Sequence, residues 1–377
     1  SKVGCGHPDP GLRQFRVLQE ALHNVLSGIC HISVDMITET LFGLRNAIPT
    51  ESLRSRPLWL WYDYFCCPQN QGSPDLQHAI DSIPAYVAQC AFFFALCPDV
   101  ESPDHSEIFG RRSWSERGWC RLEHTFWDLS SHGKPVIHVK SPRHLEATKR
   151  PQLVSIGQGS FTHDMDRQRV VPAFRRIYYD NLLGCLERGD LMEYRTRLNL
   201  QPAAIKGLPC EPIDDLVPGF KVNDDDSVPQ DVLLARFLHE NGFRHALERD
   251  AAGWSPLCYA AVRGDPHLVA ALLEKKAKAN DRTGAENHRV YAQKRTPVLS
   301  LCARLHHHEA MKQLIVCRAS VNKGDIVGIT ALHFAAATND PVGVVLLCKA
   351  GAIPETRNMF DLSALSAACE EGAMEAI

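Results

Sequence analysis

The sequence lacks a segment that could cross a membrane as a helix. Its most continuous apolar stretch beside a predicted strand, Cys90–Cys97, is eight residues long, whereas a membrane helix needs roughly 20 residues. The formal net charge of -3 over 377 residues gives no general attraction to nucleic acid or anionic lipid. The sequence also has no glycine-rich phosphate loop and no basic stripe interleaved with aromatic residues. These absences argue against membrane insertion, nucleic-acid binding and nucleotide-triphosphate chemistry.

Cysteines are present, but they form no recognisable motif. The chain has 14 of them, scattered without a C-x-x-C pair and without a secretory signal ahead of them, so we expect reduced thiols and a cytoplasmic location. Metal sites are not expected either. The consecutive residues His306, His307 and His308 point in different directions at a helix end, and Asp224–Asp226 lacks the glycine turn and spaced glutamate of a calcium loop.

The chain divides by composition into three regions. Residues 1–140 resemble an α/β domain, residues 141–230 a helical extension followed by a linker rich in proline and aspartate, and residues 231–377 a repeat array. The sequence begins without a methionine and stops inside a repeat. We therefore expect it to be a fragment at both ends.

Residues 1–140 alternate between fully apolar runs and amphipathic segments. The apolar runs predict strands at 58–64, 90–97 and 135–140. Spacings of three and four predict helices at 8–27, 30–47 and 75–89, and the S-x-x-E capping box Ser113–Glu116 predicts a further helix that reaches Leu129. Such alternation predicts a parallel sheet flanked by helices.

Two motifs in this region point to a known class of domains. The residues Trp61, Asp63, Cys66 and Gln69 form W-x-D-x-x-C-x-x-Q, and Trp119, Cys120 and Glu123 form W-C-x-x-E. Together with SIPAY at 82–86 they resemble fungal heterokaryon-incompatibility domains and the Toll/interleukin-receptor (TIR) class. The resemblance covers residues 7–140 and implies a TIR-like fold whose first strand would precede residue 1. It also implies self-association of this domain, or cleavage of NAD by Glu123; many relatives keep this glutamate for assembly or signalling.

Glu123 is therefore the candidate catalytic residue, and Asp63 is a weaker one. Breaking the bond between ribose and a cationic nicotinamide passes through an oxocarbenium-like state, which a carboxylate beside the ribose stabilises. A structural alternative exists for each residue. Glu123 could pair with Arg117 or Arg121 on a helix surface, and Asp63 could cap the turn after a strand. Cys120 has no paired base and is a weak nucleophile candidate.

The C-terminal third repeats with a fixed period. Short motifs open the repeats and contain Leu257, Leu299, the run Thr330-Ala331-Leu332-His333, and Leu365. Leu299, Leu332 and Leu365 are 33 residues apart, which is the ankyrin period, and the T-x-L-H run resembles the ankyrin signature. The resemblance implies an all-α solenoid whose concave face binds a protein partner.

The first repeat interval is nine residues longer than the others. The added residues lie between Asn280 and Thr296, where ankyrin hairpins project, and this loop carries Arg282, Arg289, Lys294 and Arg295. A basic loop could contact an acidic partner surface, and a solvated loop is an equal alternative.

These patterns favour a cytoplasmic signalling or scaffold protein without a cofactor, which binds a protein partner through ankyrin repeats and carries a TIR-like effector or assembly domain. The alternative from another class is an NAD+ nucleosidase that uses Glu123, with NAD as its substrate, whose repeats only position it.

Overall fold

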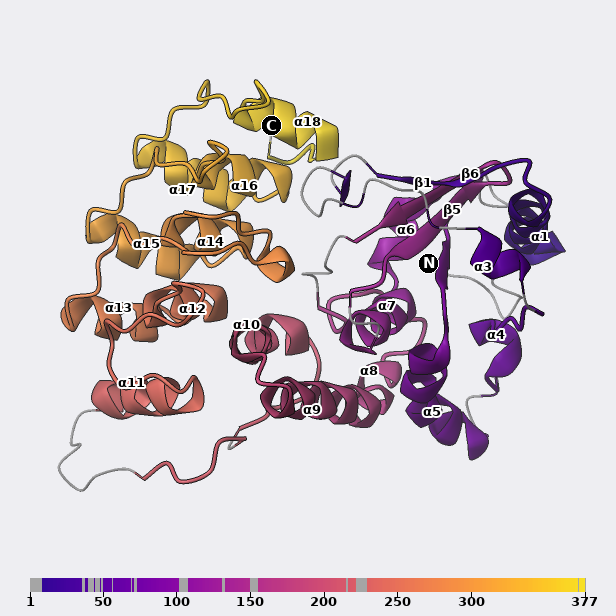
Figure 1. Cartoon of the computed structure of the whole chain (residues 1–377), viewed down its shortest axis with the longest axis horizontal. Coiled ribbons are helices and arrows are strands. Elements are labelled where there is room, and N and C mark those ends of the chain that lie inside the picture. The colour runs from indigo at the N-terminus through magenta and orange to yellow at the C-terminus, as the bar shows by residue number, and fades with distance from the viewer. Residues whose placement is uncertain are drawn as a thin grey trace. The chain divides into compact units, whose positions relative to one another are not determined.

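The computed structural model describes residues 9–35, 38–39, 44, 48, 50–55, 57–68, 70, 73–101, 108–130, 133–149, 155–214, 216–221, 229–371 and 373–376. The chain forms two compact units (Figure 1). Unit 1 comprises residues 1–181 and 204–211, and unit 2 comprises residues 182–203 and 212–377. The boundary expected at residue 140 thus falls inside unit 1, and helix α9 (Val171–Glu187) begins in unit 1 and ends in unit 2.

Unit 1 is built on a four-stranded sheet in the order β1-β6-β5-β2. Its strands are β1 (Ile32–Val34), β2 (Phe93–Leu96), β5 (Val136–Ser141) and β6 (His144–Thr148). Strand β2 runs parallel to β5 and β1 parallel to β6, but β5 and β6 form an antiparallel hairpin. A separate antiparallel pair joins β3 (Val100–Glu101) to β4 (Ile108–Phe109). The predicted parallel pairing of the second and third apolar runs is confirmed, whereas the expectation of an all-parallel sheet is wrong.

Helices cover both faces of this sheet, and the side chains of β2 alternate between the two faces. On one face, α1 (Arg13–Leu26) packs Leu18, Ala21 and Val25 against Ile137 and other buried strand residues. On the other face, Phe93 lies 5.7 Å from the ring of Trp127 in α7 (Gly118–Ser130). Helix α5 (Asp75–Gln89) packs beside α7.

The strand predicted at 58–64 does not form. Residues 58–62 form neither helix nor strand, and Asp63 begins the short helix α4 (Asp63–Cys66). The exposed fractions of Leu58, Trp59 and Leu60 are 46%, 95% and 52%. Apolar composition predicted burial here, but a run becomes a strand only where a neighbouring strand pairs with it.

Other predicted boundaries also differ. Part of the helix expected at 30–47 is strand β1, and Ile37 and Leu41 lie outside the described residues. The short helix α3 (Glu51–Arg54) follows. The capping-box helix is two helices, α6 (Arg111–Glu116) and α7, separated by an extended Arg117 with ψ 130°. Ser113 accepts a hydrogen bond from the Gly110 amide at 2.9 Å, so the cap lies earlier than predicted.

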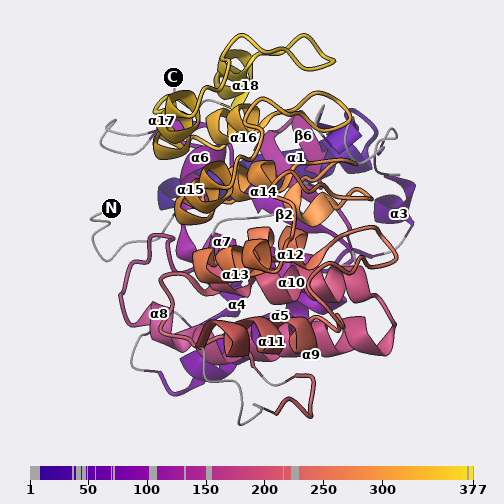
Figure 2. The same cartoon turned by 90° about the vertical axis from the view of Figure 1, so that its left-hand side faces the viewer.

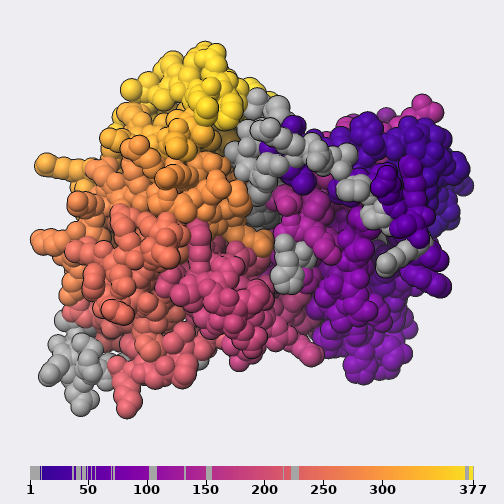
Figure 3. All heavy atoms as spheres, viewed as in Figure 1, coloured from indigo at the N-terminus to yellow at the C-terminus, as the bar shows by residue number. Residues whose placement is uncertain are grey.

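Unit 2 is a stack of helix pairs. It contains α10 (Leu191–Ile205) and α11 (Pro229–Glu240), then α12 (Pro256–Arg263) with α13 (Pro266–Glu274), α14 (Val298–Arg304) with α15 (His308–Val316), α16 (Ala331–Ala337) with α17 (Pro341–Lys349), and α18 (Ala364–Glu371). Figure 2 shows α11, α13, α15 and α17 one above another, and Figure 3 shows successive repeats following one another along the surface of this unit. The helical repeat array is therefore present as predicted.

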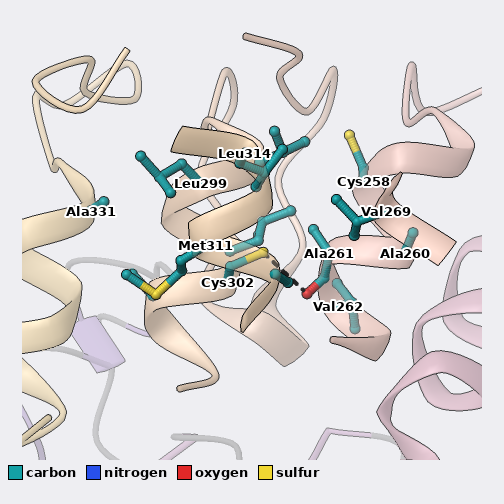
Figure 4. Close-up of a cluster of buried hydrophobic side chains, with 14 of the residues drawn as sticks. Cys258, Ala260, Ala261, Val262, Val269, Leu299, Cys302, Met311, Leu314 and Ala331 are labelled. Atoms are coloured by element: carbon teal, nitrogen blue, oxygen red, sulfur yellow. Dashed lines mark hydrogen bonds between the residues drawn. The ribbon is translucent and has the colours of Figure 1, made fainter. Parts of the chain in front are cut away.

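The repeats are held together by one continuous apolar core (Figure 4). Leu257, Leu299 and Leu332 are 0%, 2% and 3% exposed. Leu365 occupies the same motif position in α18 but is 56% exposed. Small residues let the helices approach closely, and the Cys302 thiol lies 3.8 Å from the Ala261 carbonyl. Among the described residues, no helix combines the length and apolarity needed to cross a membrane.

Candidate functional site

The sequence-predicted residues Glu123 and Asp63 come together in unit 1. Glu123 lies on α7 and Asp63 at the start of α4, and the charge of Asp63 acts on the Glu123 carboxyl. Cys97 follows β2 directly, and the Cys120 thiol interacts with Glu123, Arg117, Asp63 and Cys97. The group therefore gathers near the carboxyl end of β2, which is where ligands collect on parallel strands. We call Glu123, Asp63, Arg117, Cys120 and Cys97 the carboxylate cluster.

The two carboxyl groups of this cluster are harder to ionise than ordinary carboxyl groups. Burial, and then the negative charge of Asp63, raises the pKa of Glu123 well above its ordinary value. Asp63 as a whole residue is exposed. Burial of its carboxyl group nevertheless raises the pKa of that group, whereas the hydrogen bond from the Tyr64 amide and the positive charge of Arg117 lower it. Ionisation of both groups together is therefore unfavourable, and a positively charged ligand beside them would favour their ionised forms.

The thiols of the same region are not nucleophiles at neutral pH. Burial, followed by the charge of Asp63, raises the pKa of Cys67 to about 11. Burial also raises the pKa of Cys120, with Glu123 adding to the effect. Because the thiolate is the reactive form, neither cysteine is suited to covalent catalysis. The cysteines in the described part of the chain are all free of disulfide bonds.

The tryptophans of the two motifs anchor secondary structure. Trp61 stacks on Tyr86 of α5 with ring centres 6.0 Å apart. Trp119 donates a hydrogen bond from Nε1 to Asp166 Oδ2 at 3.3 Å, which ties α7 to the short helix α8 (Asp166–Arg169). Of the other motif residues, Cys66 is exposed and its sulfur accepts the Tyr62 amide at 3.4 Å, while Gln69 lies outside the described residues.

Arg121 and Arg117, the alternative structural partners considered for Glu123, interact with other groups. Arg121 is engaged elsewhere, because its guanidinium donates hydrogen bonds to the carbonyls of Ser115 and Ser155 at 2.6 and 2.9 Å. Arg117 instead supplies positive charge to Asp63. The sequence analysis named Arg117 only as an alternative partner of Glu123 and did not connect it with Asp63, because Arg117 and Asp63 lie 54 positions apart.

In unit 2 the signature residues join neighbouring repeats. The Thr330 hydroxyl lies 2.8 Å from His333 Nδ1, and His333 Nε2 lies 3.0 Å from the Leu362 carbonyl of the next hairpin. Burial lowers the pKa of His333, which keeps the ring neutral for these bonds. The T-x-L-H motif therefore fixes a helix start and links two repeats.

The three consecutive histidines have structural partners. His307 Nε2 lies 3.0 Å from the Val262 carbonyl, and His308 Nε2 lies 2.8 Å from Asp340 Oδ2. Within the described part of the chain, no three histidine, cysteine, aspartate or glutamate side chains are grouped so that they could hold a metal ion.

The nine-residue insertion folds back onto α10. Asn287 donates a hydrogen bond from Nδ2 to the Thr196 hydroxyl at 2.7 Å, and Arg289 Nε lies 2.8 Å from Glu193 Oε1. Among the residues that the structure describes, none forms a hydrogen bond with the buried Nη2 of Arg282. Of the four basic residues predicted to form a partner loop, Lys294 and Arg295 are exposed, whereas Arg282 and Arg289 are partly buried.

Helix α10 lies in the helical extension expected at 141–230, but its burial in spite of a polar sequence was not predicted. Arg195 lies at its centre, where Nε donates to the Asn241 carbonyl at 2.7 Å and Nη1 lies 3.2 Å from Asp250 Oδ2. Its guanidinium also lies 4.5 Å from the ring centre of Phe243. Buried charges are tolerated when they are paired in this way. The helix thus completes the first end of the array by polar contacts.

Comparison with known proteins supports one part of the sequence reading. The ankyrin repeat model matches residues 252–284, which include α12 and α13. The E3 ubiquitin-protein ligase XBAT33 of Arabidopsis thaliana is 32% identical over 125 residues, which make up 30% of this chain and 23% of that protein. The matched region thus spans less than a quarter of that relative. The chain contains an ankyrin repeat, while the resemblance of residues 7–140 to TIR and heterokaryon-incompatibility domains rests on the motifs alone.

Proposed function

We propose that unit 2 binds a protein partner through its ankyrin repeats and that the chain serves as a signalling or scaffold protein. The observation that carries this proposal is the stack of helix pairs joined by the Thr330–His333 cap and one apolar core. Such arrays present an extended surface made of inner helices and hairpins. The similarity to part of an E3 ubiquitin-protein ligase agrees with a role in contacting proteins.

A capture experiment tests this function. The full chain, used as bait in an extract of the source cells, is expected to retain a protein that is lost when Leu332→Ala destabilises the array. The control is Leu365→Ala, which changes the exposed counterpart of Leu332 and should retain the same protein. Equal retention by both variants would contradict binding through the repeats.

A second candidate function is favoured by the carboxylate cluster. We propose as an alternative that unit 1 cleaves NAD+ between ribose and nicotinamide, with Glu123 beside the ribose. In that reaction the bond electrons leave with nicotinamide, water adds to the oxocarbenium carbon, and its proton passes to solvent. The raised pKa of Glu123 and the repulsion from Asp63 support the idea, because the cationic substrate would restore the ionised carboxylate.

The test of this alternative is the release of nicotinamide from NAD+ by the full chain. Glu123→Gln keeps the shape of the side chain and removes its charge, so it should abolish turnover. Arg121→Gln is a matched control, since Arg121 binds carbonyl groups on the same helix and lies outside the carboxylate cluster. Turnover that survives Glu123→Gln would refute the assignment.

Self-association of unit 1 is a separate proposal, which rests on the TIR resemblance.

A further inference from the structure

The tips of three successive hairpins lie side by side in unit 2. The Ile326 amide donates to the Lys294 carbonyl at 3.1 Å, and the Met359 amide donates to the Val327 carbonyl at 2.9 Å. These backbone bonds place the end of the insertion, the second tip and the third tip in one row. We name the exposed residues of this row, Lys294, Arg295, Ile326, Met359 and Phe360, the fingertip patch.

The apolar part of the fingertip patch is exposed on a fixed backbone. Ile326, Met359 and Phe360 are 58%, 68% and 46% exposed. Asp325 Oδ1 accepts the amides of Val327 and Ile329 at 3.0 and 2.9 Å. Asn358 Oδ1 accepts two amides of the third tip in the same way, at 2.9 and 3.1 Å. Because both turns are held by side chains, the patch loses little conformational entropy when a partner binds.

The other part of the fingertip patch is cationic. Lys294 and Arg295 are exposed, and Arg282 lies near Arg295. Burial, and then the charge of Arg295, lowers the pKa of Arg282, while the nearby Asp325 partly offsets this effect. Asp361, the acidic residue of the third tip, is already paired with Arg357 at 3.1 Å. The end of the row at Lys294 and Arg295 therefore favours negative charge on a partner.

We infer that the fingertip patch binds a protein segment that carries apolar side chains followed by aspartate or glutamate. The apolar side chains cover Ile326, Met359 and Phe360, and the carboxylates face Lys294 and Arg295. This inference rests on the proposed protein-binding function and adds the chemistry of the partner. The insertion positions Lys294 and Arg295 for this binding. The bond between Arg289 and Glu193 and the bond between Asn287 and Thr196 hold its backbone against α10.

A peptide-display selection tests the inference. The full chain is used to select from random 16-residue peptides, and the probes are the enriched peptides themselves. Enriched sequences should combine apolar residues with a carboxylate-rich end. The double variant Ile326→Ser/Met359→Ser should bind them about tenfold more weakly, as expected for central apolar contacts. Lys294→Glu/Arg295→Glu should also weaken binding, and this effect should diminish as salt is raised.

Matched substitutions on α17, the second helix of its pair, control for general effects. Val345 is 51% exposed there and Lys349 is also exposed, so Val345→Ser and Lys349→Glu should leave peptide binding unchanged. If peptides enrich but the fingertip variants bind them normally, the inference fails while protein binding by the repeats stands. If no peptide enriches, the inference fails, and the capture experiment decides separately whether the repeats bind a protein. Binding to phosphatidylserine vesicles that the fingertip variants abolish would assign the patch to a membrane surface and would also overturn the inference.

Discussion

Leu332→Ala should destabilise the repeat array selectively. Leu332 is 3% exposed and lies on α16, which packs against α14 on one side and α18 on the other. Truncation of a buried leucine removes its apolar contacts and leaves a cavity, which together cost about 2–5 kcal/mol. For a unit of this size, that loss lowers the unfolding midpoint by about 4–20 °C. In a nearest-neighbour array, the loss should stay within unit 2.

Hydrogen exchange followed by mass spectrometry can resolve the two units. Peptides from α14 to α17 should lose protection in Leu332→Ala, whereas peptides from α5 and α7 should exchange as in the unaltered chain. Leu365→Ala is the matched control. It changes the same motif position, but the side chain is 56% exposed, so we expect a change within about 0.5 kcal/mol. Equal loss of protection in both units, or equal effects of the two substitutions, would refute the reasoning.

Three further changes probe other parts of the chain. Gly264→Ala should destabilise unit 2 by about 1–3 kcal/mol, because Gly264 has φ +79° and a Cβ there would lie 2.3 Å from His307 Nδ1; an unchanged denaturation midpoint would contradict this. Arg289→Ala should cost roughly 1–3 kcal/mol and expose the insertion to protease, because it breaks the bond to Glu193; unchanged cleavage would show that the bond does not hold the loop. Burial, with nearby positive charges, lowers the pKa of His138 to about 3. As the pH drops from about 6.5 toward 3, the unfolded chain therefore binds a proton at His138 that the folded chain does not, and the free energy of unfolding should fall. His138→Gln should flatten this pH dependence, and an equal slope in both proteins would contradict it.

Sequence periodicity predicted the repeats well because each repeat makes the same local and neighbouring contacts. Thr330 and His333 are three residues apart, so the cap they form is visible in the sequence. The burial of helix α10 was not predicted, for the opposite reason. Its charges are satisfied by Asp250, Glu193 and the insertion, which lie far from it in sequence or on its own turns. Neither the composition of α10 nor the spacing of its residues in the sequence predicts such ion pairs.

The sheet was predicted in part for a related reason. Strands β2 and β5 are apolar and buried, and their parallel pairing agrees with the alternation of strands and helices. Strand β6 contains His144 and Glu146, and its place is set by the hairpin with β5. The run 58–62 shows the reverse error, since its apolar residues have no pairing strand among the described residues.

The candidate site was predictable as a pair of motifs but its electrostatics were not. The motifs identified Glu123 and Asp63, and the fold places them close enough for one charge to raise the pKa of the other. The roles of Arg117 and Cys97 depend on the break between α6 and α7 and on the end of β2. Both features are set by tertiary structure.

The most direct test of the central claim is hydrogen exchange of the full chain with and without the protein that it captures. The account predicts added protection in unit 2, at the hairpin tips around Ile326 and Met359 and on α14 and α16, which are the first helices of their pairs. Protection confined to unit 1, with the repeats exchanging as in the free chain, would contradict a protein-binding ankyrin array.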